Sequence, residues 1–244
     1  MMRYNCSANK ENYSQRNNRY VFVNKDVRIY SGVTCAPTSM IQALDYAGFK
    51  IPTIAGEQPE DSFTKFMVES SEIDTKYKSM LPVMWRDWKE GKKDAYAPHE
   101  IHKLLAYGAN VYLGTEAVIF REDVTLNELT KQICVDSLPA VISGCIPYNN
   151  TKLNHVVTLV GFTYDDHYKE DTKPRSLIID DPYGDLRKNY APNSTGNDIE
   201  ISFQYFIKNF KPLGKEIKWA HLIQKPIAVV WKVFQDVFSL KMKT

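Results

Sequence analysis

The chain has 244 residues, 43% of them hydrophobic and 25% charged, which are the proportions of an ordinary soluble globular protein with enough sequence for one large domain. Its formal net charge of +2 is too small to indicate nucleic acid or an anionic membrane as the main partner. No apolar run approaches the roughly 18 residues of a membrane span, and residues 1–19 lack the apolar stretch of a secretory signal. We therefore expect a cytoplasmic protein without a membrane span, which another protein could later release to the cell wall.

The first predicted elements lead up to and include Cys35. Residues 20–30 alternate loosely and are expected to hold a short strand. Beyond them, apolar residues recur on one helical face, and Pro37 lies in the first turn, where its missing N–H costs nothing. The pattern predicts a helix from Cys35 to Ala47, capped by Thr34 and terminated by Gly48.

The next region, residues 51–112, has a mostly helical and polar pattern and is expected to form a helical insertion or a lid. Helices are predicted over Ser62–Val68 and over Pro98–Tyr107, the second closing at Gly108. The stretch between these helices contains two tryptophans and the Lys/Glu-rich run Lys89–Lys93. Its simpler interpretation is a solvated connector, with a lid as the alternative.

Beyond residue 125 the pattern changes from helices to strands. A helix capped by Thr125 is predicted over residues 126–136. Three short β-branched runs bounded by turns or polar loops predict strands: Pro139–Ser143, His155–Val160 and Ser176–Ile179. A helical half followed by a strand-rich half predicts an α+β fold. The tail is apolar at helical spacing, so we expect a C-terminal helix within residues 227–244. Without a repeat or a Gly/Ser linker, residues 1–244 are predicted to form a single domain.

The four cysteines contain no C-x-x-C pair, so neither a structural zinc site nor a redox dithiol is predicted. Cys134 and Cys145 have apolar neighbours and are expected to be buried small hydrophobes, whereas Cys6 belongs to a polar N-terminal arm. His99 and His102 are three residues apart, which does not match the four-residue spacing of H-E-x-x-H. We therefore expect no metal and no cofactor.

Cys35 differs from the other cysteines because it is predicted in the first turn of a helix. A thiol attacks a carbonyl only as thiolate, and unpaired N–H groups at a helix N-terminus favour that anion. An imidazolium nearby would lower the thiol pKa further. His155 is predicted to open a strand after a polar loop at residues 149–154, and Asp180 and Asp181 end the next strand. Either carboxylate could accept from the imidazole and hold its tautomer.

Three blocks of residues then resemble the signatures of a known family. They are Gly32-Val-Thr-Cys35-Ala-Pro-Thr-Ser39, Asn154-His155-Val-Val-Thr-Leu-Val-Gly161-Phe162 and Asp180-Asp181-Pro182-Tyr-Gly184-Asp185. They are similar to the C-x-P-T-S, (G/N)-H-x-V-x-V-x-G and D-P-x-G patterns of papain-like cysteine peptidases of bacteria and phages. The group concerned is the one related to the double-glycine leader peptidases of bacteriocin exporters. The blocks occur in the family's order, with 120 and then 26 residues between Cys35, His155 and Asp181.

The resemblance implies a fold and a set of site residues. It implies a papain-like fold, in which a helical half bearing the nucleophile packs on an antiparallel sheet half bearing the histidine and the aspartate. It also implies Cys35 as nucleophile, His155 as general base and Asp181 as the orienting carboxylate. Such enzymes place a glutamine upstream whose amide contributes to the oxyanion hole, and Gln15 in Tyr13-Ser14-Gln15-Arg16-Asn17 matches that block. The interval from Gln15 to Cys35 is longer than in papain itself.

The predicted function is that of a thiol protease or amide hydrolase acting through an acyl-enzyme intermediate. Its expected substrates are peptides, proteins or peptidoglycan peptides, with no nucleic-acid partner. Two alternatives stay open: a transglutaminase-like acyl transfer to an amine, and a catalytically decayed papain-fold binding module. In the second case Cys35 would be a buried helix cysteine and His155 a hydrogen-bonded histidine at a strand edge.

Overall fold

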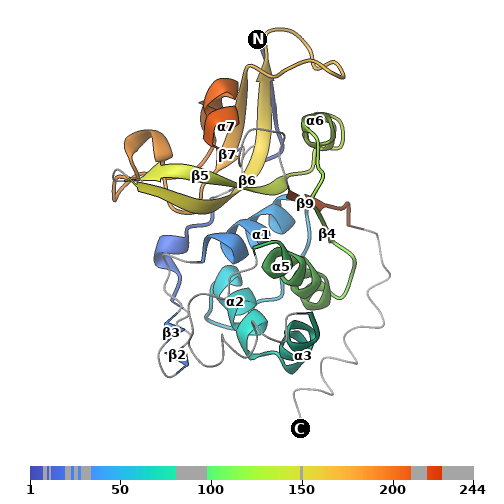
Figure 1. The fold of residues 1–244 in the computed structure, drawn as a ribbon, viewed down its shortest axis with the longest axis vertical. Coiled ribbons are helices and arrows are strands. Elements are labelled where there is room, and N and C mark those ends of the chain that lie inside the picture. The colour runs from blue at the N-terminus through green and yellow to red at the C-terminus, as the bar shows by residue number, and fades with distance from the viewer. Residues whose placement is uncertain are drawn as a thin grey trace.

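The computed structural model describes residues 1–7, 10, 12–19, 23–24, 27–28, 34–80, 98–148, 151–209 and 219–226. Within these residues the chain is α+β, with helices below and above one antiparallel sheet (Figure 1). The first half of the chain supplies most of the helices, and the second half supplies most of the strands. This arrangement confirms the predicted fold class. The predicted C-terminal helix and the possible lid around Lys89–Lys93 lie outside the described residues.

Four α-helices are described in the helical half. They are α1 (Cys35–Tyr46), α2 (Pro59–Glu69), α3 (Ser71–Met80) and α5 (Pro98–Leu113). Helix α1 has nearly its predicted bounds, and Gly48 follows it with φ of +90°, a conformation that glycine adopts without strain. The predicted end of α5 at Gly108 is wrong. A Cβ at Gly108 would lie against Met67 and Ile73, so this glycine allows α5 to pack closely on its neighbours instead of ending the helix.

The sheet has seven strands in the described part of the chain, all paired antiparallel. Their order is β4 (Val118–Arg121), β9 (Ala220–Ile223), β5 (Ala140–Tyr148), β6 (Thr151–Tyr164), β7 (Ser176–Asp180) and β8 (Ile199–Ser202), with β1 (Met2–Asn5) also pairing with β6. A separate hairpin joins β2 (Val23–Asn24) to β3 (Val27–Arg28), where one short strand was expected. Two further helices, α6 (Leu126–Cys134) and α7 (Phe203–Asn209), follow β4 and β8 in the chain.

Two hydrophobic clusters lie on the two faces of this sheet. Val141 and Val156 belong to a cluster with the apolar side chains of α1, α2 and α5. Their neighbours Ile142 and Val157 belong to a second cluster with α6 and α7. The alternation follows from the two-residue period of a strand. Helix α1 is thereby packed directly on the central strands, with its N-terminus beside β6.

The predicted bounds of two strands need correction. Strand β6 begins at Thr151, so His155 lies within the strand and does not open it, and the expected loop at residues 149–154 is mostly strand. Strand β5 likewise continues to Tyr148. Strands β5 and β6 pair from Ala140 to Tyr148, with Gly144 opposite His155. Because of this pairing, each strand is longer than the apolar run from which it was predicted.

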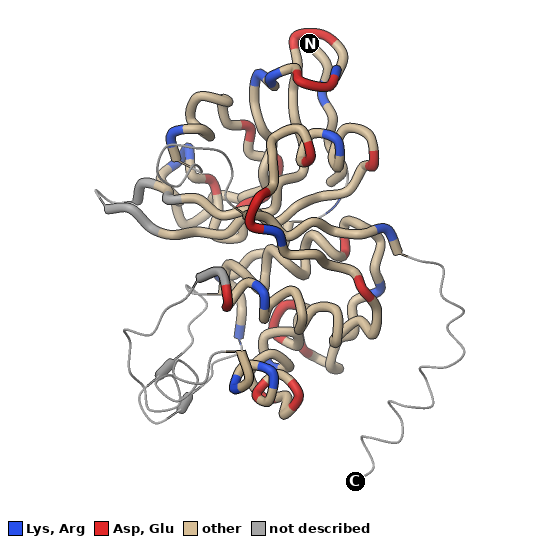
Figure 2. Tube along the Cα trace, turned by 45° about the vertical axis from the view of Figure 1, so that its right-hand side comes forward, with Lys and Arg blue, Asp and Glu red and all other residues tan. Residues whose placement is uncertain are grey.

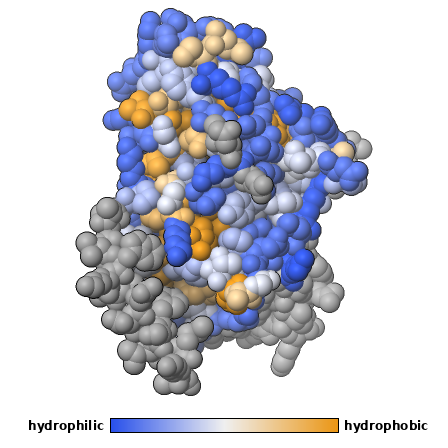
Figure 3. All heavy atoms as spheres, turned by 180° about the vertical axis from the view of Figure 1, so that it is seen from behind, coloured by the Kyte–Doolittle hydropathy of each residue, from blue (hydrophilic) through white to orange (hydrophobic). Residues whose placement is uncertain are grey.

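Charged residues of both signs are spread over the described part of the chain (Figure 2). Acidic and basic residues are interspersed over both halves of the chain (Figure 2), in agreement with the net charge of +2. The face in Figure 3 is mainly hydrophilic, with apolar residues in small groups. None of the helices within the described ranges combines the length and the apolar character that a membrane crossing requires.

Candidate active site

Helix α1 places Cys35 at its first residue, against the sheet. The helix starts here because Thr34 leaves helical geometry and accepts the N–H of Thr38 on its carbonyl, while Pro37 occupies the first turn. The prediction that the Thr34 side chain caps the helix is wrong. Its hydroxyl instead accepts a hydrogen bond of 2.8 Å from the amide of Asn18, which also bonds Thr38 at 3.0 Å. The N-terminal segment is therefore fixed to the start of α1.

The Cys35 thiol forms a hydrogen bond with the imidazole of His155. Burial alone would raise the pKa of the thiol, but this hydrogen bond and the charge of the imidazolium hold it below the ordinary value of 9.0. A hydrogen bond with the backbone of Val156 acts in the same direction. The pair therefore favours thiolate and imidazolium, the protonation state in which a cysteine is nucleophilic.

On the other side of the ring, His155 Nε2 lies 2.7 Å from Asp181 Oδ1. Burial opposes the protonation of His155, but the charge of Asp181 and the contact with Cys35 raise its pKa to about 10. His155 is 8% exposed and Asp181 is fully buried, so little water screens this pair. Because Nε2 is engaged by the carboxylate, Nδ1 is the ring nitrogen left for the thiol.

Each residue of the segment Asp181-Pro182-Tyr183-Gly184 has a contact at this site. Asp181 Oδ1 accepts the N–H of Tyr183 at 2.8 Å in addition to the imidazole. The carbonyl of Pro182 accepts the N–H of Gln15 at 2.9 Å. Gly184 has φ of +119°, which allows the chain to turn directly after the aspartate. The D-P-x-G pattern thus corresponds to one turn that presents the carboxylate.

Gly196 supports this turn from behind. Its carbonyl accepts the N–H of Asp181 at 2.9 Å, and a Cβ at Gly196 would overlap the carbonyl of Asp181. No side chain fits between the two backbones. Gly196 therefore sets how closely the returning chain approaches the orienting carboxylate.

Asp180, the alternative carboxylate, contacts a different set of groups. Its Oδ2 accepts from the Tyr46 hydroxyl of α1 at 2.8 Å, and its Oδ1 accepts from the N–H of Asp198 at 2.6 Å. Burial raises its pKa to about 7. The structure therefore places Asp181, and not Asp180, against the imidazole, while Asp180 joins the end of α1 to the sheet.

Gln15 begins the 3₁₀ turn η1 (Gln15–Asn17) and is 1% exposed. Ser14 caps the turn by accepting the N–H of Arg16. Through its own N–H, Gln15 is bonded to Pro182, the residue next to Asp181. The structure therefore brings the segment of Gln15 to the loop of Asp181, and Asn18 brings the same segment to the start of α1.

Two tyrosines whose contacts the sequence did not indicate pack against the imidazole. Tyr190 donates from its hydroxyl to Asp181 Oδ2 at 3.1 Å, and its ring meets His155 edge to face at 6.1 Å. The Tyr183 ring lies 6.5 Å from the imidazole and 5.3 Å from the Tyr190 ring, so the two tyrosines pack side by side against His155. Tyr190 has φ of 57°, and Asn189 before it has φ of 47°. Asn189 is a residue type that favours the left-handed region, but nothing in the sequence indicates this conformation for Tyr190 or its contact with Asp181.

The other described cysteines differ from Cys35. Burial raises the pKa of both Cys6 and Cys134 to about 12. The Cys6 thiol donates to the carbonyl of Val160, so the polar N-terminal segment that contains Cys6 packs against the sheet. Among the described residues, no group of three or more His, Cys, Asp and Glu side chains could hold a metal ion.

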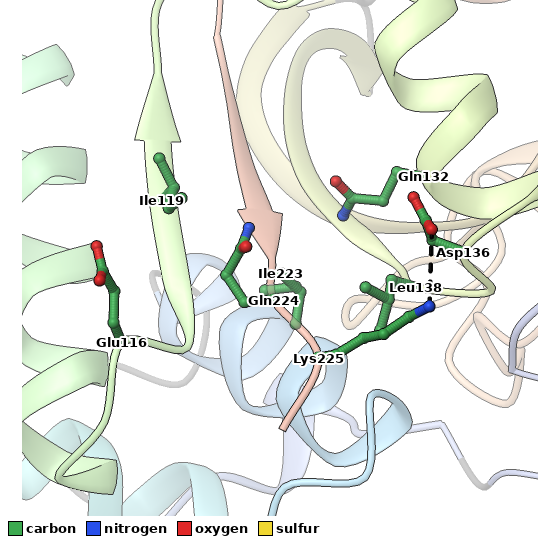
Figure 4. Close-up of a pocket in the computed structure, with 8 residues that line it drawn as sticks. All are labelled: Glu116, Ile119, Gln132, Asp136, Leu138, Ile223, Gln224 and Lys225. Atoms are coloured by element: carbon green, nitrogen blue, oxygen red, sulfur yellow. Dashed lines mark ion pairs between the residues drawn. The ribbon is translucent and has the colours of Figure 1, made fainter. Parts of the chain in front are cut away.

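A surface cavity of about 460 Å³ lies away from these residues (Figure 4). Ile119 and Ile223 line it from adjacent strands, and an ion pair of 3.7 Å joins Lys225 to Asp136 across one side. None of its lining residues belongs to the cluster around Cys35. We therefore assign the candidate site from the thiol, imidazole and carboxylate contacts and not from this cavity.

A comparison with known protein families gives one match. The model of a family described as "Peptidase_C39 like family" matches residues 9–216, which include Gln15, Cys35, His155 and Asp181. A comparison with curated proteins gives no significant match.

Proposed function

The chain belongs to the Peptidase_C39 like family, and from this membership and the contacts around Cys35 we propose that it is a cysteine hydrolase that cleaves peptide or amide bonds. The observation that carries the proposal is the continuous chain of contacts from the Cys35 thiol through His155 to Asp181. A nucleophile, a base and a group that orients the base are the three parts that acyl transfer by a cysteine requires.

In the proposed first step, the Cys35 thiolate attacks the carbonyl carbon of the substrate. The carbonyl oxygen gains the negative charge of a tetrahedral intermediate, which the Cys35 backbone N–H and the Gln15 side-chain amide would stabilise. The His155 imidazolium then donates its proton to the leaving amine as the C–N bond breaks. The product of this step is a thioester on Cys35 and a free amine.

In the proposed second step, neutral His155 removes a proton from water, which attacks the thioester. The second tetrahedral intermediate collapses to a carboxylic acid and releases Cys35, which returns to the thiolate–imidazolium pair. Asp181 keeps the imidazole in one tautomer in both steps and stabilises its positive charge. The raised pKa of His155, about 10, supports its role as the proton donor at neutral pH.

The substrate class follows from the reaction type and from the family, which implies a peptide. The stem and bridge peptides of peptidoglycan are the first substrates that we propose to test, together with unstructured peptides. If an amine replaces water in the second step, the same groups would carry out acyl transfer. Adding a primary amine to the assay separates the two reactions, because only transfer gives an amide product.

The first test of the function is the reactivity of Cys35. Below neutral pH only a thiol with a lowered pKa is alkylated rapidly. At pH 6 we expect iodoacetamide to label Cys35 far faster than Cys6 or Cys134, whose pKa values of about 12 keep them protonated. Peptide mass spectrometry identifies the labelled residue. Equal labelling of the three cysteines, or labelling led by Cys6, would contradict the proposal.

The second part of this test uses variants. We expect Cys35→Ser to abolish hydrolysis, Gln15→Ala to lower turnover by about 100- to 1,000-fold through the loss of an oxyanion donor, and Asp181→Asn to lower it less. All three variants should melt near the wild-type temperature. A Cys35→Ser protein that retains the biological effect would show that the chain acts by binding instead.

A further inference from the structure

The guanidinium of Arg16, the residue after Gln15, is held by three successive carbonyl groups. Its Nη2 donates to the carbonyl of Tyr190 at 2.7 Å, and its Nη1 donates to those of Ala191 and Pro192, both at 3.0 Å. An arginine can do this because its donors form a rigid planar fork. Arg16 thus binds the backbone of the loop that carries Tyr190.

One face of the guanidinium also packs on an aromatic ring. Its central carbon lies 4.5 Å from the centroid of the Tyr183 ring, a cation–π distance. Gly184 lies next to the same carbon, since a Cβ built on it would be 3.4 Å away, an ordinary van der Waals distance. Tyr183 and Gly184 directly follow Asp181 and Pro182. The guanidinium of Arg16 therefore packs against the turn that carries Asp181.

Arg16 therefore connects two parts of the site that are far apart in the sequence. On its own side, the turn η1 holds Gln15 and is bonded to Pro182. On the other side, Tyr190 carries the hydroxyl that bonds Asp181, and its left-handed backbone is unfavourable for a tyrosine. Such a conformation persists only when its surroundings fix it, and the carbonyl of Tyr190 is fixed by Arg16.

We propose that Arg16 is a positioning residue that holds the Gln15 turn in register with the loop of Tyr190 and Asp181. This inference rests on the proposed function for the role of Gln15 as an oxyanion donor. Arg16 itself does not reach the reacting atoms. Its effect is to keep the Gln15 amide in place when the negative charge forms, and a displaced donor loses most of its stabilising effect.

Two reactions of Cys35 separate this role from a general loss of structure. Alkylation by iodoacetamide displaces iodide from a saturated carbon and forms no oxyanion. Acylation by p-nitrophenyl acetate passes through a tetrahedral oxyanion and releases p-nitrophenolate, which is measured by absorbance. We expect Arg16→Ala to slow acylation by about 10- to 100-fold and to leave alkylation at pH 6 within about twofold.

A double-substitution cycle identifies the residue through which Arg16 acts. In a Gln15→Ala background, Arg16→Ala should slow acylation by less than about twofold, because the donor that it positions is already absent. Arg16→Lys keeps the charge but not the fork, so its acylation rate should be intermediate. Arg175→Ala is the matched control, since it removes an exposed arginine whose guanidinium pairs with Asp165 at the surface. Circular dichroism and thermal melting check the fold of each variant.

The outcomes are distinct. The same loss of acylation in the wild-type and Gln15→Ala backgrounds would overturn the inference, as would acylation that is unaffected by Arg16→Ala. If Arg16→Ala does not fold, the Arg16→Lys cycle gives the same comparison. A wild-type protein that is not acylated on Cys35 would overturn the proposed function itself, and the inference with it.

Discussion

Asp180 and Asp181 are adjacent, and both are fully buried, but they contact different elements. Asp181 bonds His155 of β6, whereas Asp180 bonds Tyr46 of α1. The two carboxylates also differ in what their charge does. The charge of Asp181 faces an imidazole that it keeps protonated, but ionising Asp180 is unfavourable because burial raises its pKa to about 7. Replacing each by asparagine should therefore give different results.

For Asp181→Asn we expect the pKa of His155 to fall from about 10, because the negative charge that favours the imidazolium is lost. Asp180→Asn should leave it near 10. Titration of the histidine side chains by NMR measures both values. If instead Asp180→Asn lowers the pKa of His155 and Asp181→Asn does not, the assignment of the orienting carboxylate is wrong.

Asp180→Asn should instead change how stability depends on pH. The pKa of Asp180 is higher in the folded state than the ordinary value of 3.8, so its contribution to stability is lost as the pH rises through about 7. An asparagine does not ionise. Between pH 4.5 and 7.5 the melting temperature of the variant should therefore fall less than that of the wild type, because in this range the unfolded chain has released the Asp180 proton and the folded protein still holds it.

At the scale of the elements, the contact of β1 with β6 depends on one glycine. A Cβ at Gly161 would lie against the backbone carbonyl of Tyr4 and 2.8 Å from a methyl group of Ile178, so no side chain fits there. Gly161 also lies where the register of β6 against β7 shifts. The final glycine of the H-x-V-x-V-x-G pattern is thus explained by the strand that packs across it.

We predict that Gly161→Ala displaces β1 and exposes Cys6. In the native protein, the N–H and the thiol of Cys6 both bond Val160, and burial keeps the thiol unreactive. Titration with a thiol reagent at neutral pH should label Cys6 much faster in the variant. Gly48→Ala is a suitable control, since a Cβ there would meet nothing within 4 Å although its φ of +90° adds local strain. Unchanged protection of Cys6 in Gly161→Ala would contradict the prediction.

These elements show which features a sequence can predict. Helix α1, helix α6 with its Thr125 capping box and strand β7 follow from local periodicity and end signals, and they were predicted nearly in full. Strand β1 was not predicted, because its four mixed residues do not by themselves indicate a strand. They form a strand by pairing with β6, about 160 residues later in the chain. The extension of β6 before His155 likewise depends on pairing with β5. The contacts of Tyr190 and Arg16 depend on a loop conformation that has no local signal.

At the scale of the whole molecule, a buried histidine pair joins the helical half to the end of the sheet. His102 Nδ1 of α5 lies 2.9 Å from His221 Nε2 of β9, and both rings contact Trp219. Burial, and then the proximity of His102, lower the pKa of His221 well below 6.5. Because the unfolded chain would bind a proton that the folded one excludes, this group makes stability fall as the pH drops below about 6.5.

We predict that His221→Gln reduces this acid sensitivity, because glutamine offers a polar group at the same reach but does not titrate. The difference in unfolding free energy between wild type and variant should change between pH 7 and 5 by at most about 1.4 kcal/mol per pH unit. Denaturant titrations at several pH values measure it. His167→Gln, on an exposed loop, is the matched control. Parallel pH profiles for wild type and His221→Gln would refute the prediction.

The residues that contact one another around Cys35 are far apart in the sequence, and this separation matters during synthesis of the chain. Gln15 and Cys35 leave the ribosome early, but His155, Pro182 and Gly196 are added more than a hundred residues later. Until then the nascent chain has neither the imidazole that lowers the thiol pKa nor the turn that orients it. The thiol therefore remains an ordinary cysteine until these residues have been added. Its reactivity begins only when the segment that contains His155, Pro182 and Gly196 has been synthesised and has folded back onto the start of α1.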